Sequence, residues 1–70
     1  MSPQAREVLI YLKGHGSIEP MDALKKLGVY RLAARIHEIR EDGHVVDTAW
    51  VKVSRHTKYG KYIYKGQRII

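Results

Sequence analysis

Three stretches in the N-terminal part of the chain space their apolar side chains every three to four residues, the period of an amphipathic helix. In each stretch these side chains share one face, and glycines separate the stretches. Ser2 and Pro3 suit the N-cap and first turn of the first helix, and Gly28 suits the end of the second. The pattern predicts helices over residues 3–14, 20–27 and 30–42.

After Asp42-Gly43 the pattern changes to that of β-strands. The segment HVVDTAWVKVS is rich in β-branched and aromatic residues, KYIYKGQRII repeats this character, and the polar segment RHTKYG lies between them. This predicts a β-hairpin with strands over residues 45–53 and 61–65. The alternation leaves open which face of the hairpin packs on the helices, because both faces carry valines.

Two short helices joined by a glycine-containing turn are the outline of a helix-turn-helix, and the hairpin after them would be its wing. We therefore expect an α+β fold: a single winged helix-turn-helix domain over residues 1–70, with three helices followed by a two-stranded antiparallel hairpin. Trp50, Tyr62 and Tyr64 are expected in the sheet and core, because aromatic residues favour strands. Tyr59, beside the loop, is expected to be exposed.

The net charge of +6 is unevenly distributed along the chain. Residues 1–43 hold seven basic and six acidic side chains, whereas residues 44–70 hold six basic and one acidic. The hairpin therefore carries an excess of +5, a localised positive field that indicates a polyanionic partner. The chain has no cysteine, no signal-peptide pattern and no apolar run near the roughly 20 residues of a membrane span. We expect a soluble protein of the bacterial cytoplasm that does not bind membranes.

The segment ALKKLGVYRLAARIHEIREDGH resembles a family of small winged-helix domains common in bacteriophage and prophage genomes. The resemblance rests on an alanine-leucine pair, a glycine and a run of the type R-L-A-A-R-I-x-x-L-R-x-x-G. The matching positions are Ala23-Leu24, Gly28, Arg31 to Ile36, Ile39-Arg40 and Gly43. The resemblance implies a DNA-binding helix-turn-helix, in the context of phage regulation or recombination.

The third predicted helix is the candidate for reading DNA. With its apolar stripe turned inward, its N-terminal part would enter the major groove. Arginine can hydrogen-bond guanine O6 and N7 together, and alanine allows close approach to a thymine methyl. The candidate residues are Tyr30, Arg31, Ala34, Arg35 and His37. The same residues are also compatible with a helix face that only contacts water, because Arg35 can pair with Glu38 one turn away.

The hairpin loop adds four candidates for phosphate contacts, namely Arg55, His56, Lys58 and Lys61. The same charges could only guard the strand edges against aggregation. Aromatic residues interleaved with lysines would also suit single-stranded nucleic acid. Arg40 is expected to pack its stem on the hairpin or to meet phosphate.

Other function classes find little support. The four histidines are scattered without metal-ligand spacing, and the sequence suggests neither a catalytic constellation nor a cofactor site. We expect a non-enzymatic, sequence-specific double-stranded DNA-binding protein, either a transcriptional regulator or an excisionase-like architectural factor. Useful specificity would need a homodimer or copies side by side. The alternative is a protein-interaction module, such as a phage inhibitor of an acidic host protein.

Overall fold

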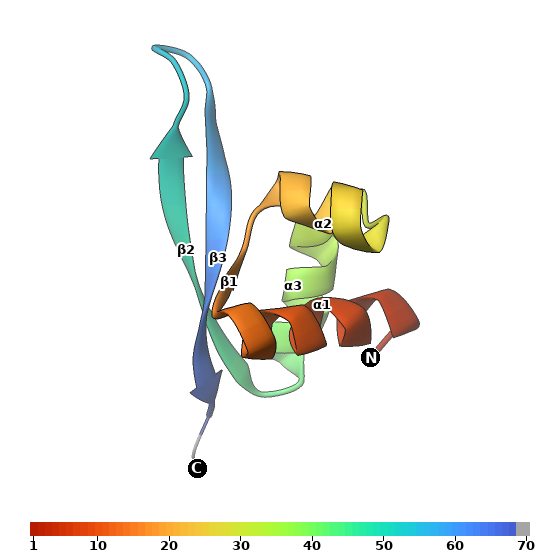
Figure 1. Cartoon of the computed structure of the whole chain (residues 1–70). Helices are drawn as coiled ribbons and strands as arrows, with labels where there is room; N and C mark the ends of the chain where they lie inside the picture. The colour runs from red at the N-terminus through yellow and green to blue at the C-terminus, as the bar shows by residue number, and fades with distance from the viewer. Residues whose placement is uncertain (69–70) are drawn as a thin grey trace.

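The computed structural model describes residues 1–68 and contains three helices and three strands in the order α1, β1, α2, α3, β2, β3. The helices gather on one side of the sheet, and the β2–β3 hairpin projects past them as a wing (Figure 1). The elements are α1 (Pro3–His15), β1 (Ser17–Ile18), α2 (Pro20–Leu27), α3 (Leu32–Glu41), β2 (His44–Lys52) and β3 (Lys58–Gln67).

The core lies between the three helices and the base of the sheet. The predicted stripe of α3 is confirmed, because Leu32, Ile36 and Ile39 are all buried. They pack with buried side chains from α1, β1, α2 and β2, which are Ala5, Val8, Leu12, Ile18, Ala23 and Val46. Half-buried Tyr62 and Tyr64 pack against this core from β3, as expected for strand aromatics.

Helix α3 begins at Leu32, two residues later than the prediction of residue 30. Gly28 adopts a left-handed conformation (φ 67°), and the buried Val29 donates its N–H to the carbonyl of Ala23. Arg31, the N-cap, has non-helical dihedrals (φ −107°, ψ 67°). Because Val29, which lies between α2 and α3 in the sequence, is buried, the turn extends through Tyr30 and Arg31. Helix α3 therefore starts later than the helical pattern indicates.

The sheet has three strands, so the expectation of a two-stranded sheet is incomplete. β1 pairs antiparallel with β3, with Ser17 opposite Ile63, and the strand order is β1-β3-β2. A two-residue strand is too short to display alternation, which is why the sequence pattern did not reveal it. The hairpin strands also differ from the predicted residues 45–53 and 61–65, because β3 begins three residues earlier and extends to Gln67.

The strand register decides which face of the hairpin packs on the helices. Thr48 lies opposite Tyr62 and Trp50 opposite Gly60, and this face, which includes the buried Val46, is turned toward α3. The other face carries residues such as Lys61 and its partner Ala49. At Trp50 this face is open to solvent, since the residue is 64% exposed.

Candidate nucleic-acid interface

The turn before α3 presents polar side chains to solvent, next to two alanines in the first turn of the helix. Tyr30 is 86% exposed and Arg31 is also exposed, while Ala34 is half-buried. In the described part of the chain no side chain caps the first N–H groups of α3. His37, one turn further on, is exposed and its Nε2 lies 3.2 Å from Glu41 Oε1. This end of α3 therefore offers a guanidinium, a phenol and unpaired backbone donors in one place.

Arg35, by contrast, makes its contacts within the protein. Its Nε lies 2.9 Å from Glu38 Oε2, and its Nη1 donates to the side chain of Gln4 at 3.3 Å. Glu38 in turn accepts from the N–H (2.9 Å) and the hydroxyl (3.1 Å) of Ser2. The structure thus contains the intrahelical pair that the sequence left as an alternative, and this pair ties α3 to the start of α1.

This contact makes stability sensitive to acid. The Ser2 N–H holds the pKa of Glu38 below its usual 4.5, and the Ser2 hydroxyl and the Arg35 charge lower it further. Because the pKa is lower in the folded state, the stabilisation is complete above the unfolded pKa and is lost as pH falls through the folded pKa. We expect Glu38→Gln to lower the melting temperature at neutral pH, and the difference from wild type to shrink as pH falls below 4.5 through the depressed pKa of Glu38. Melting curves from neutral to acidic pH test this, with Glu7→Gln as control; a constant difference at every pH would contradict it.

Arg40 fixes the wing relative to α3. Its Nε and Nη2 donate to the carbonyl of Val46 at 3.0 and 2.6 Å, and Nη2 also donates to Thr48 Oγ1 at 3.0 Å. The guanidinium carbon lies 6.0 Å from the centre of the Tyr62 ring. Arg40 does contact the hairpin, and it does so through its charged head, whereas the sequence indicated a contact of its stem.

A groove of about 430 Å³, here called the α3–wing groove, separates the start of α3 from the wing. Three of its lining residues have a small side chain or none, namely Ala33 and Ala34 of α3 and Gly60 of β3. A Cβ atom at Gly60 would lie 3.2 Å from Thr48 Cγ2 and 3.7 Å from Trp50 Cζ3. The remaining lining residues are Pro20, Tyr30, Arg31, Leu32 and Tyr62.

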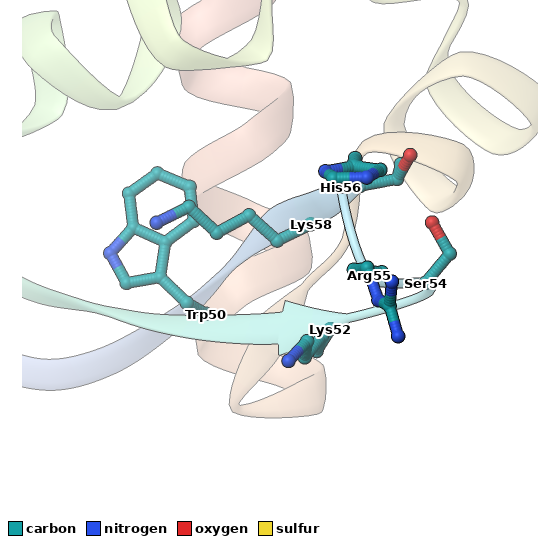
Figure 2. Close-up of a pocket in the computed structure, with 7 residues that line it drawn as sticks. Trp50, Lys52, Ser54, Arg55, His56 and Lys58 are labelled. Carbon is teal, nitrogen blue, oxygen red and sulfur yellow. The ribbon is translucent and has the colours of Figure 1, made fainter.

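A second concavity, of about 480 Å³, lies on the wing and is here called the wing pocket (Figure 2). Trp50 forms one wall, and the expectation that it is a core residue is wrong, since it is 64% exposed. The Lys58 ammonium lies 4.8 Å from the centre of the indole ring. The other lining residues are Lys52, Ser54, Arg55, His56 and Thr57.

The structure brings most of the predicted binding residues to two adjoining sites. Tyr30, Arg31 and Ala34 line the α3–wing groove, and three of the four loop candidates line the wing pocket, namely Arg55, His56 and Lys58. Lys61 is elsewhere, on the face of the sheet turned away from α3. Tyr59, expected to be exposed, is half-buried, and burial followed by its contact with Glu19 raises the pKa of Tyr59 above 10.0.

Sequence reasoning missed the contribution of Trp50, Lys52 and Gly60 to these sites. The available signal was the alternation that places Trp50 and Lys52 on one face with Val46. That signal was insufficient, because alternation along one strand does not tell which face packs on the helices or which residue of the other strand lies opposite.

The comparison with protein families agrees with this architecture. The family model described as a winged helix-turn-helix domain matches residues 3–65, so the chain belongs to the winged helix-turn-helix family. This is a class of DNA-binding domains that are typically non-enzymatic, and it indicates DNA as the class of partner. Comparisons with curated proteins and with solved structures give no match. Among residues 1–68, no helix is long and apolar enough to cross a bilayer.

Proposed function

We propose that this protein binds double-stranded DNA in a sequence-specific manner, with α3 in the major groove and the wing on the adjacent backbone. The observation that carries the proposal is the juxtaposition of two sites. Tyr30 and Arg31 line the α3–wing groove, and this groove lies next to the cation-lined wing pocket because Gly60 of the groove pairs with Trp50 of the pocket. Such a surface can meet a base edge and phosphates at once.

The start of α3 is suited to approach bases closely. Ala33 and Ala34 keep this part of the helix narrow, so the helix backbone can come close to the base edges in the major groove of DNA. Arg31 precedes the helix, where its planar guanidinium can meet guanine or a phosphate. We propose Tyr30, Arg31, Ala34 and His37 as contacts, and Arg35 as a positioning residue that holds α3 on α1 through Glu38.

The wing supplies the sequence-independent part of the affinity. Arg55, His56 and Lys58 line one concavity, and in the described part of the chain no acidic side chain lines it. Each phosphate that these cations neutralise is expected to steepen the dependence of log K on log salt by about 0.9. Lys61 faces away from this surface, so its charge would act through the long-range field.

The charge distribution and the resemblance of residues 23–43 to phage winged-helix domains together support a regulatory or recombination role, as a transcriptional regulator or an excisionase-like architectural factor. Selection of preferred duplexes from a random pool separates the two roles. An enriched motif would support a sequence-reading regulator, and a symmetric motif would indicate a homodimer. Tight binding without a motif would support the architectural role, and absence of binding at low salt would favour the protein-interaction module.

Arg31→Ala is expected to weaken binding to the selected duplex by about tenfold, in line with the 1–3 kcal/mol of a good base contact. Fluorescence anisotropy over a salt series measures this, with Lys13→Ala on α1 as a control for the loss of one positive charge. A larger loss on the selected duplex than on random duplex would identify a base contact, whereas equal losses with a shallower salt slope would identify a phosphate contact. Unchanged affinity on both duplexes would contradict the proposed docking of α3.

A further inference from the structure

We infer that Trp50 is a direct DNA contact: its indole packs on a deoxyribose of one strand while Lys58 binds the neighbouring phosphate. This inference rests on the proposed function and specifies how the wing engages the duplex. The wing would then contribute an apolar contact as well as a charged one.

The first argument is the exposure of the indole. Trp50 is the only tryptophan of the chain, and 64% of its surface is open to solvent. It lies on the face of the hairpin that is turned toward α3, with the edge of its ring above Gly60. A Cβ atom at Gly60 would lie 3.7 Å from Trp50 Cζ3, so one edge of the ring rests against the neighbouring strand while most of the residue is uncovered. Tryptophan is enriched at binding surfaces because its large apolar ring carries a polar N–H at one edge.

The second argument is the charge beside the ring. The Lys58 ammonium lies 4.8 Å from the ring centre, and Lys52 and Arg55 line the same pocket (Figure 2). A ligand that fits these neighbours has an apolar face and an anionic group within a few ångströms of each other. A nucleotide has this composition, since its sugar is flanked by phosphates.

The third argument is position along the molecule. Gly60 lines the α3–wing groove and Trp50 lines the wing pocket, and the two residues lie directly opposite each other in the β2–β3 pair. A strand of DNA that leaves the start of α3 toward the wing therefore meets the indole first. Because the bases of a duplex are stacked on each other, the apolar surfaces along its backbone are the deoxyribose rings.

The single tryptophan makes a direct test possible. Addition of duplex DNA to the intact protein is expected to change the emission of Trp50 with the same midpoint as the anisotropy curve of labelled duplex. Emission that stays constant through a complete anisotropy transition would overturn the inference. Single-stranded DNA is the second arm: stronger quenching and tighter binding than with duplex would overturn the assignment to deoxyribose in favour of base stacking.

Variants separate the apolar contact from the charged one. Trp50→Ala is expected to weaken duplex binding about fivefold or more at unchanged salt slope, and Trp50→Phe to retain most of the affinity. Lys58→Gln is expected to reduce the salt slope by about 0.9. Val53→Ala, which trims another exposed apolar residue of the wing, is the matched control and should bind like wild type. Thermal melting of each variant shows whether it remains folded.

The results distinguish this inference from the function on which it rests. If wild type binds duplex and Arg31→Ala weakens it, while Trp50→Ala and Trp50→Phe both bind like wild type, the inference is wrong and the proposed function stands. If wild type binds no duplex at low salt, both are wrong. A loss in Trp50→Ala that Trp50→Phe restores, together with the emission change, would establish the contact.

Discussion

Replacing Ile36 with alanine is expected to lower the free energy of unfolding by about 2–5 kcal/mol. Ile36 is fully buried at the centre of the apolar stripe of α3, and truncation removes its packing against the other helices and leaves a cavity. A domain of this length has a total stability of about 4–10 kcal/mol, so the loss would leave much of the protein unfolded or close to unfolding. Urea denaturation followed by circular dichroism measures the change.

Two variants serve as controls for this prediction. Ile36→Val removes one methylene and is expected to cost about 0.5–1.5 kcal/mol. Ile10→Ala truncates a side chain of α1 that is 71% exposed and should change stability by less than about 0.5 kcal/mol. Equal effects of Ile36→Ala and Ile10→Ala would mean that α3 does not pack as described.

Replacing Arg40 with methionine is expected to cost about 1.5–3 kcal/mol of stability and to weaken DNA binding as well. The change removes the donors that reach the Val46 carbonyl and Thr48 Oγ1. Because these bonds set the position of the wing relative to α3, their loss would let the two contact surfaces move independently. The same denaturation experiment gives the stability, and anisotropy with duplex gives the affinity.

Arg40→Lys is the informative companion to this variant. It keeps the charge but cannot donate to two acceptors through a planar fork, so it should restore only part of the stability. If Arg40→Lys matched wild type in both measurements, charge alone would explain the role of Arg40. If Arg40→Met kept full affinity at a lower stability, the wing would not depend on this bond for its placement on DNA.

Much of the candidate site could be predicted because local chemistry marks it. The apolar spacing of Leu32, Ile36 and Ile39 shows which side of α3 is buried and hence which side is free. The excess of positive charge after residue 43 marks the wing as basic, and the role proposed for it rests on this charge. These signals need no knowledge of distant contacts, since helical periodicity and charge are properties of short segments.

Other features depend on contacts between distant segments, and for these the sequence left alternatives open or the prediction was wrong. Arg35 was a candidate for DNA contact, yet its partners Glu38 and Gln4 draw it toward α1. Trp50 was expected in the core because aromatic residues favour sheets, but it is 64% exposed. For Arg35 one of the two partners, Gln4, is 31 residues away in the sequence, and the exposure of Trp50 depends on what packs against its face of the hairpin.

By itself, the sequence determined the three helices, the hairpin, the buried face of α3 and the basic wing, because each follows from spacing or composition within a short stretch. Only the tertiary structure decided the third strand, the hairpin face that meets α3, and the positions of Lys61 and Trp50. The physical reason is that strand pairing and side-chain burial are set by which segments meet in space. A shift of one residue in strand register would have turned every side chain of the wing to the other face.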